Sequence, residues 1–323
     1  MNFIDGKSVL VTGGTGSFGK RLIRTLLDTT DARRIVVFSR DELKQYEMRE
    51  RMDDPRIRYF IGDVRDRERL ERAFDGVQLV VHAAALKQVP AAEYNPFEAV
   101  KTNVHGAQNV IEAAIDRGVE RVVALSTDKA SSPINLYGAT KLVSDKLFVQ
   151  GNAYASGKRT RFAVVRYGNV VGSRGSVVPF FQAKAKTGEL PITDERMTRF
   201  WITLQQGVDF VLSSLQTMQG GELFVPKIPS MRVTDLAEAI APGVPTRIVG
   251  IRPGEKLHEE MISVDDARRT LDVGDRFVIQ PEFPWWGNSH LEGRPLSEGF
   301  AYTSDRNDAW LDPEALRAML DRD

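Results

Sequence analysis

The feature that most constrains the fold is the alternation of short apolar runs with longer amphipathic ones over the first half of the chain. Apolar runs rich in Val and Ile, such as "KSVLVTGG" and "RRIVVFSR", are typical of strands buried on both faces of a parallel sheet. Amphipathic runs such as "SFGKRLIRTLLDT" predict helices that cross between them. We therefore expect an α/β fold with a Rossmann-like, doubly wound parallel sheet. The expected strands are residues 7–14, 33–40, 57–64, 77–85, 121–128 and 160–172, and the expected helices are 17–29, 99–118 and 136–156.

The pattern is less regular after Gly172, where Pro and Gly become frequent and residues 232–241 and 313–321 are the clearest helical segments. We expect residues 1–172 to form the dinucleotide-binding Rossmann domain. Residues 173–323 would form a smaller C-terminal substrate-binding lobe, with some later segments returning to the sheet.

Composition excludes several classes of protein and site. Lys plus Arg equals Asp plus Glu, at 44 each, so no charge surplus favours nucleic acid or an anionic membrane as a partner. The chain has no cysteine, which excludes disulfides and thiolate chemistry. Because no apolar run approaches the ~20 residues of a membrane span, and the first residues lack the pattern of a signal peptide, we expect a soluble cytoplasmic protein.

A glycine-rich turn follows the first expected strand. "VLVTGGTGSFGKRL" places Gly13, Gly16 and Gly19 between that strand and an amphipathic helix, the context in which such glycines bind a dinucleotide. Glycine permits the tight turn, the approach of backbone to a diphosphate and close packing of helix on strand, and the helix N-terminus faces the phosphates. The alternative is an ordinary glycine turn.

The end of the second expected strand bears on the choice of cofactor. Ser39 and Arg40 come first and Asp41 follows. A guanidinium there can bind a 2′-phosphate, which favours NADP over NAD. Alternatively, Arg40 is a solvated charge and Asp41 binds the ribose. Further along, Asp63 and Val64 would lie near the adenine, and the small residues Ala83, Ala84 and Ala85 would let the chain pass close to the cofactor.

Tyr137 and Lys141 form a Tyr-x-x-x-Lys pair after a strand that ends in "LST". Residues four apart share a helix face, so the ammonium can lower the phenol pKa and hold the nicotinamide ribose. The phenolate would then take a proton from a substrate hydroxyl. Thr127 could donate a hydrogen bond to that hydroxyl, or simply satisfy backbone at the strand end.

A second acid–base pair, Asp128 and Lys129, follows the same strand at the edge where such sheets bind ligands. Oxidation of a sugar hydroxyl to a ketone acidifies the hydrogen on the neighbouring carbon. A neutral Lys129 could remove that hydrogen, and a protonated Asp128 could assist a leaving group one carbon further on; both states need shifted pKa values. The alternative is a salt bridge in a solvated loop.

Several longer strings resemble the extended short-chain dehydrogenase/reductase family from about Lys7 to Leu320: "TGGTGSFG", "SRDELKQ", "AALKQVPAAE", "STDKA", "PINLYGATK", "RYGNVVGSRGSVVPFF" and "GIRPGEKLHE". Within this family the chain is most similar to the soluble UDP-N-acetylglucosamine 4,6-dehydratases that invert carbon 5. Retaining relatives typically carry Asp-Glu where this chain has Asp128 and Lys129, and long membrane-anchored relatives usually carry Met in place of Tyr137. The segments "SS" at 131–132 and "WWGNSHLEG" at 285–293 are less typical.

The resemblance implies an activity and roles for individual residues. Tyr137 and Lys141 would serve oxidation at C4, and Asp128 and Lys129 would serve elimination of water across C5 and C6. Hydride returns to C6 and Lys129 reprotonates C5 on the opposite face, giving UDP-2-acetamido-2,6-dideoxy-β-L-arabino-hex-4-ulose, an intermediate of pseudaminic acid biosynthesis. Other expected cofactor contacts are Thr15, Ser17, Phe18, Lys44 and Asn103, and the expected substrate contacts are Lys87, Asn169, Val177, Val178, Pro179, Phe180, Arg252 and Glu255.

Some alternatives remain open at the level of sequence. Val177 and Phe180 could be plain core residues. A UDP-sugar 4-epimerase would need Tyr137 and Lys141 without the second pair, and a catalytically silent NADP-binding scaffold or sensor would need neither. His258 has no clustered partner ligands, so we expect it to be structural and predict no metal site. A homo-oligomer, a dimer or a hexamer, is expected.

Overall fold

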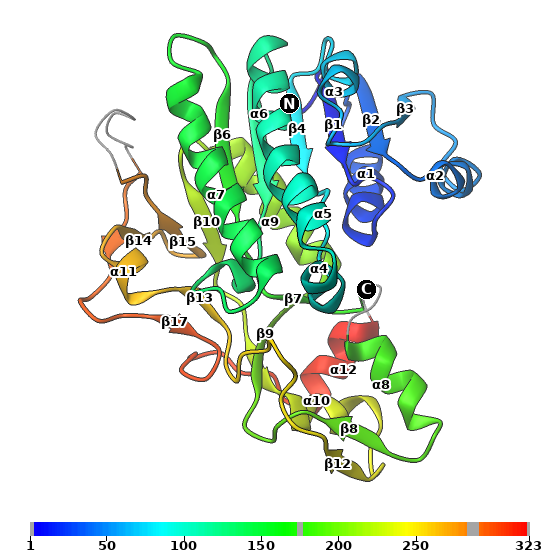
Figure 1. Cartoon of the computed structure of the whole chain (residues 1–323), viewed down its shortest axis with the longest axis vertical. Coiled ribbons are helices and arrows are strands. Elements are labelled where there is room, and N and C mark those ends of the chain that lie inside the picture. Colours follow the sequence, from blue (N-terminus) through cyan, green and yellow to red (C-terminus); the bar gives the residue numbers. More distant parts are fainter. Residues whose placement is uncertain (1–2, 173–176, 283–290, 322–323) are drawn as a thin grey trace.

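A computed structural model describes residues 3–172, 177–282 and 291–321 (Figure 1). The chain builds one large sheet with helices on both faces and a smaller lobe below it. Within the described part of the chain, no helix is both long and apolar enough to cross a membrane.

The large sheet has ten strands in the order β16-β14-β15-β10-β6-β5-β4-β1-β2-β3. Seven neighbouring strands pair in parallel and carry the fold: β1 (Ser8–Thr12), β2 (Arg34–Ser39), β3 (Ile57–Ile61), β4 (Leu79–His82), β5 (Arg121–Leu125), β6 (Arg161–Val165) and β10 (Leu223–Pro226). The strand order reverses where β1 lies between β2 and β4. The loops after β1 and β4 therefore diverge and open a crevice at the carboxyl edge, where such sheets bind ligands.

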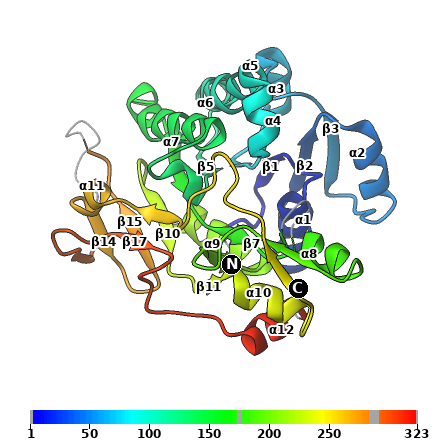
Figure 2. The ribbon, with the colours of Figure 1, turned by 60° about the horizontal axis from the view of Figure 1, so that its bottom comes forward.

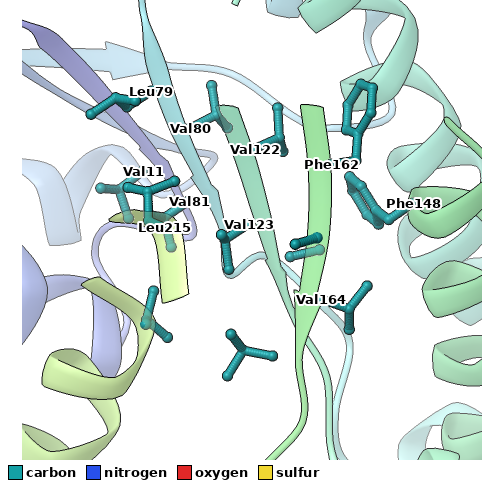
Figure 3. Close-up of a cluster of buried hydrophobic side chains, with 14 of the residues drawn as sticks. Val11, Leu79, Val80, Val81, Val122, Val123, Phe148, Phe162, Val164 and Leu215 are labelled. Atoms are coloured by element: carbon teal, nitrogen blue, oxygen red, sulfur yellow. The ribbon is translucent and has the colours of Figure 1, made fainter. Parts of the chain in front are cut away.

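Helices cover both faces of this sheet (Figure 2). α1 (Ser17–Thr29) and α9 (Leu204–Thr217) pack together on one face. α3 (Arg67–Ala73), α6 (Gly106–Asp116) and α7 (Leu136–Tyr154) lie on the other. Branched side chains of the strands fill the space between the sheet and the helices (Figure 3). Phe148 on α7, Leu215 on α9 and Phe162 on β6 are buried in the same core. The predicted α/β class with a doubly wound sheet is confirmed.

Two expected elements differ in detail. The sequence predicts one helix over 99–118. The structure has three consecutive helical segments there, namely α5 (Pro96–Val100), a π-helical turn η1 (Lys101–His105) and α6, and a separate helix α4 (Val89–Tyr94) precedes them. The strand expected over 160–172 ends with β6 at Val165, and β7 (Asn169–Val170) pairs with another sheet. The backbone N–H of Asp128 still bonds to the carbonyl of Tyr167 beyond the end of β6, and the chain leaves the main sheet after this residue.

The smaller lobe has its own core. β7, β9 (Thr198–Ile202) and β11 (Ser230–Arg232) form a three-stranded sheet, and β8 (Leu190–Ile192) pairs with β12 (Thr246–Ile248). α8 (Val177–Ala185), α10 (Val233–Ile240) and α12 (Pro313–Asp321) pack around them. Trp201, Phe181, Leu236 and Leu316 are buried there, apart from the core of the large sheet.

Later segments lie against the large sheet. α9 packs on one face of this sheet and β10 is one of its strands. β15 (Arg276–Ile279), β14 (Thr270–Asp272) and β16 (Arg294–Pro295) extend the sheet with antiparallel pairs. β13 (Glu260–Ile262) pairs with β17 (Tyr302–Thr303), and the short helix α11 (Val264–Ala267) packs against β14. At the other edge of the large sheet, the short helix α2 (Glu42–Arg49) packs against β2 and β3. A domain boundary after Gly172 stays a prediction, since residues 173–176 lie outside the described residues, as do 285–290 of the segment at 285–293.

Candidate active site

The predicted glycine turn connects β1 to α1. Gly13 has φ +67°, and a Cβ there would lie 2.9 Å from the backbone nitrogen of Ala84, so the turn needs glycine at this position. Gly16 precedes the first residue of α1, and a Cβ on Gly19 would lie 2.6 Å from Gly14. The open N-terminus of α1 therefore faces the crevice with backbone close behind it, as a diphosphate site requires.

The residues after β4 line the same crevice. Thr12 at the end of β1 hydrogen-bonds His82 at the end of β4 (2.8 Å), and its hydroxyl also accepts a bond from the N–H of Ala84. Asn103, expected to contact the cofactor, is fully buried. Its side-chain oxygen accepts from the N–H of Leu86, and its side-chain nitrogen donates to the carbonyl of Leu86 and to the Thr140 hydroxyl. It thereby positions the loop after β4.

The end of β2 brings the charged candidates together. Arg40 Nη1 lies 3.5 Å from Asp63 Oδ2, and Asp63 also binds Arg65. Asp41 caps α2 by accepting from the N–H of Lys44, and it forms an ion pair with the Lys44 ammonium (2.6 Å). These bonds lower the pKa of Asp41. Asp41 thus has short bonds to the backbone and the ammonium of Lys44, whereas the contact of Arg40 with Asp63 is longer, which leaves Arg40 the more available charge at this strand end.

Seven further candidates for cofactor contacts lie on or near these elements. Thr15, Ser39 and Val64 are buried, and Ser39 binds the Gln45 side chain. Phe18 on α1 stacks against Tyr167, with ring centroids 6.4 Å apart. Ser17 is the first residue of α1, and Ala83 and Ala85 flank Ala84 after β4.

α7 carries the predicted redox pair. Asn135 caps this helix by accepting from the N–H of Gly138, which sets Tyr137 and Lys141 on its first turns. Lys141 is 3% exposed, and its ammonium has no hydrogen-bond partner among the residues that the structure describes. Burial lowers the pKa of Lys141, and Asp145 one turn further on opposes this. A buried ammonium with unused donors suits the hydroxyls of a ribose.

The environment of Tyr137 differs from the expectation. Burial raises the pKa of Tyr137 to about 12, while the charge of Lys129 and a hydrogen bond with the Thr127 side chain oppose the rise. The pKa of Tyr137 is therefore raised and not lowered, because desolvation outweighs the opposing charge of Lys129. A lowering effect of Lys141 on this pKa stays a prediction.

Asp128 and Lys129 lie in a 3-10 turn, η2 (Asp128–Ala130), directly beside Tyr137. Lys129 Nζ lies 3.0 Å from Asp128 Oδ1, which also accepts from the Thr127 hydroxyl. Asp128 is fully buried, and its Oδ2 atom has no hydrogen-bond partner within the described ranges. A buried carboxylate oxygen without a partner is costly unless a ligand or a proton satisfies it.

Sequence reasoning missed a second carboxylate at Lys129. Glu259 Oε1 lies 3.2 Å from Lys129 Nζ and 3.7 Å from Arg199 Nε. Its signal was the acidic end of "GEKLHEE", but only the fold shows which side chain it meets. The buried pair Asp145 and Arg166 behind Lys141 (3.3 Å) was missed for the same reason.

The two carboxylates change the expected state of Lys129. Burial lowers the pKa of Lys129, but Asp128 and Glu259 together overcome it and raise the pKa above its usual value. Two anions beside one cation favour the ammonium, so Lys129 must give up this proton before it can act as the base considered from the sequence.

The expected substrate contacts lie on several elements: β7, α8, the segment before β13 and the loop after β4. Asn169 on β7 has a buried side-chain oxygen without a partner in the described part of the chain. Arg252 and Glu255 form a loose ion pair (3.7 Å), and the Arg252 guanidinium lies 5.9 Å from the ring centre of Phe180. Lys87 is exposed after β4.

The remaining residues of α8 divide between core and surface. Val178 is buried in the core of the smaller lobe, and Val177 packs against that core. Pro179 is exposed and Phe180 is 37% exposed, so Phe180 is not a core residue. His258 hydrogen-bonds Thr198 (2.8 Å) and thus links β9 to the segment before β13.

A hollow of about 550 Å³ lies away from these residues, near the far end of α7. It is lined by Asn152, Ala153, Ser156, Gly157, Arg161, Gln219 and Gly220. The clustered acids, bases and glycines at the carboxyl edge of the sheet are stronger evidence for the active site.

Comparison with known proteins agrees with this geometry. The sequence profile of a family described as "Polysaccharide biosynthesis protein" matches residues 9–281. The chain belongs to this family. A UDP-N-acetylglucosamine 4,6-dehydratase (inverting) from Campylobacter jejuni is 54% identical, with 97% of each chain covered. A UDP-glucose 4-epimerase from Rickettsia prowazekii is 40% identical, covering 96% of this chain and 90% of that one.

Solved structures show the same fold in members of the extended short-chain dehydrogenase/reductase group. Pen from Bacillus thuringiensis superposes with a TM-score of 0.91 at 36% identity, covering 99% of this chain and 100% of that one. DesIV from Streptomyces venezuelae, a dTDP-glucose 4,6-dehydratase solved with NAD bound, has a TM-score of 0.69 at 26% identity, covering 77% and 86%. The family resemblance identified from the sequence motifs is confirmed.

Proposed function

We propose that this protein is a UDP-N-acetylglucosamine 4,6-dehydratase that inverts carbon 5, a hydro-lyase. The observation that carries the proposal is the placement of Asp128 and Lys129 beside Tyr137 at the carboxyl edge of the sheet. Tyr137 and Lys141 suffice for oxidation and reduction at one carbon. A second acid and base next to them suit the removal of a proton and of a leaving group from the adjacent carbons.

We propose NADP as the cofactor, and the residues present fit it. Gly13, Gly16 and the N-terminus of α1 would hold the diphosphate, and the unpaired donors of Lys141 would hold the nicotinamide ribose. Arg40 would bind the 2′-phosphate. The bound cofactor would accept hydride from C4 and return it to C6, so no net redox change occurs.

The side chains would divide the remaining steps. Tyr137 would take the proton of the C4 hydroxyl, with the Thr127 hydroxyl and the Lys129 charge favouring its phenolate form. Lys129 would remove the C5 hydrogen, and Asp128 would donate a proton to the departing C6 hydroxyl through its unpartnered Oδ2. Return of a proton to C5 from Lys129 on the opposite face would invert that centre.

The substrate would lie across both lobes. Asn169, Lys87 and Arg252 would contact the sugar and the diphosphate, since amide and guanidinium donors suit phosphate oxygens. Glu255 would accept from the ribose hydroxyls, and Phe180 beside Arg252 would flank the uracil.

One incubation tests this function. Purified enzyme with UDP-N-acetylglucosamine in heavy water should give a 6-deoxy-4-keto sugar with deuterium at C5 and the β-L-arabino configuration, read by NMR. A 4-epimerase would return a 6-hydroxylated UDP-sugar without deuterium at C5, and a silent scaffold would return the substrate. Either result refutes the proposal. Cofactor extracted from the same enzyme and weighed by mass spectrometry should be NADP(H); NAD(H) alone contradicts the role of Arg40.

We also propose the setting in which the enzyme works. Its product would supply pseudaminic acid biosynthesis in the cytoplasm, and the protein would be a homo-oligomer, a dimer or a hexamer. The dehydratase activity on which these proposals rest is supported by the similarity to the inverting dehydratase of Campylobacter jejuni over nearly the whole chain. Light scattering of the purified protein would give the oligomer size, and a monomer would contradict the proposed homo-oligomer.

A further inference from the structure

The ammonium of Lys129 lies between two buried carboxylates that come from distant parts of the sequence. Its Nζ atom is 3.0 Å from Asp128 Oδ1 and 3.2 Å from Glu259 Oε1. The side chain of Lys129 is 27% exposed, whereas those of Asp128 and Glu259 are 1% and 3% exposed. The mechanism above uses Asp128 and Lys129 but gives Glu259 no task.

Glu259 is held by two contacts besides that with Lys129. Its carboxylate meets Arg199 Nε (3.7 Å), and its backbone N–H donates to the Ser304 hydroxyl (2.9 Å). Arg199 is itself fixed, because its guanidinium donates to the carbonyls of Leu257 and Lys256 at 3.1 and 3.0 Å. A carboxylate so constrained can hold a flexible lysine side chain in one place.

The loop that bears Lys129 is attached to the same segment at further points. The Ser131 and Ser132 hydroxyls donate to Glu260 Oε1 at 2.8 and 2.6 Å, and Lys256 Nζ donates to the Ser131 carbonyl. Glu259 Oε2 nevertheless has no partner among the residues described. The bonds of Glu260 anchor the loop, whereas Glu259 reaches the reactive ammonium itself.

We propose that Glu259 is a positioning residue for Lys129. It fixes the ammonium beside Asp128 and Tyr137, and its charge sets the pH at which Lys129 gives up its proton and becomes the base for C5. This inference rests on the proposed dehydratase function.

The charges around Lys129 determine whether the loss of Glu259 raises or lowers the pKa of Lys129. Asp128 and Glu259 favour the ammonium, while Arg199 disfavours it, and Tyr137 and Lys256 are further titratable neighbours. A base must be neutral, so the C5 exchange rate should rise with pH until Lys129 is deprotonated. Removal of the Glu259 charge should therefore move the rise in exchange rate to lower pH. An opposite charge as near as Glu259 is to Lys129 (3.2 Å) typically shifts a pKa by about 1–3 units.

The test is the pH dependence of deuterium incorporation at C5, measured by NMR on the cofactor-loaded enzyme with UDP-N-acetylglucosamine. In Glu259→Gln the exchange rate should level off about 1–3 pH units lower than in the wild type. The KM should stay within about twofold while kcat changes, because the residue acts on the base and not on substrate binding. Glu259→Asp, which keeps the charge, should return the profile toward that of the wild type.

Glu260→Gln is the matched control, since it removes a neighbouring carboxylate that binds serine hydroxyls and not the ammonium. Its profile should level off at the wild-type pH. An unshifted profile in Glu259→Gln, or an equal shift in Glu260→Gln, would overturn the inference. A wild-type enzyme without any C5 exchange would instead refute the proposed function.

A stability measurement covers the case in which Glu259→Gln folds poorly. Lys129→Ala leaves Glu259 buried without its ammonium, and an uncompensated buried charge is strongly destabilising. The double variant Lys129→Ala/Glu259→Gln should therefore melt at a higher temperature than Lys129→Ala alone. A double variant that melts at or below the single one would show that Glu259 acts elsewhere.

Discussion

At the scale of single residues, Lys129 decides which reaction the site can perform. Lys129→Ala should still oxidise C4, because Tyr137 and Lys141 remain, but it should stall before water leaves. Stopped-flow absorbance should show partial reduction of the nicotinamide, while formation of 6-deoxy product and deuterium incorporation at C5 fall by about 10²–10⁴-fold.

Lys101→Ala is a suitable control, since Lys101 is exposed and paired with Glu98 (3.1 Å) outside the crevice. It should keep the wild-type rate. Normal C5 exchange in a folded Lys129→Ala enzyme would exclude Lys129 as the base and leave it as a partner in an ion pair.

His82 gives a residue-scale prediction for stability. It is buried at the junction of β1 and β4, and burial, followed by the charge of Lys141, lowers its pKa from 6.5 to about 3. The unfolded chain therefore binds this proton first as the pH falls. The stability that neutral His82 contributes is complete above pH 6.5 and declines toward pH 3, by about 1.4 kcal/mol for each unit well below 6.5.

Urea unfolding between these pH values tests this. His82→Gln should show a flatter loss of unfolding free energy with acid than the wild type, whereas His105→Gln, at an exposed position on η1, should follow the wild-type slope. Parallel slopes for wild type and His82→Gln would show that the acid sensitivity arises elsewhere.

At the scale of elements, α7 and the loop of Lys129 touch backbone to backbone. A Cβ on Gly138 would clash with the backbone carbonyl oxygen of Lys129, so Gly138→Ala must push the loop away from the helix. Displacement of a catalytic group by about 1 Å can cost 10²-fold in rate. We expect a loss of about that size in dehydration, measured with cofactor and substrate present.

Gly207→Ala on α9 is the matched helix glycine, because a Cβ there would meet no atom within 4 Å. It should keep the activity and the melting temperature of the wild type. Equal activity in both variants would mean that the loop yields without moving Lys129.

At the scale of the whole molecule, UDP and NADP should each stabilise the protein against unfolding, through contacts in different lobes. UDP at about 100 times its Kd should stabilise the protein by about 2.7 kcal/mol. Arg252→Ala should reduce this effect in a thermal-shift assay and leave the stabilisation by NADP unchanged, because Arg252 lies in the smaller lobe beside Phe180.

Arg247→Ala removes an exposed arginine of the same lobe that pairs with Glu189 (2.8 Å), so its response to UDP should equal that of the wild type. An unchanged UDP response in Arg252→Ala would place the nucleotide away from Phe180.

The sequence by itself determined the features that depend on neighbouring residues. The alternation of buried strands and amphipathic helices specified the doubly wound sheet, because each period of apolar residues fits one kind of element. The spacing of Tyr137 and Lys141 placed both on one face of a helix, and the glycines after the first strand specified a turn that tolerates no Cβ at Gly13.

Only the tertiary structure decided the features that depend on contact across the fold and on burial. It brought Glu259 to Lys129, used Asn103 to hold the loop at Leu86, and raised the pKa values of Tyr137 and Lys129. A pKa depends on desolvation and on every charge within a few ångströms, and these neighbours come from segments that no local pattern connects.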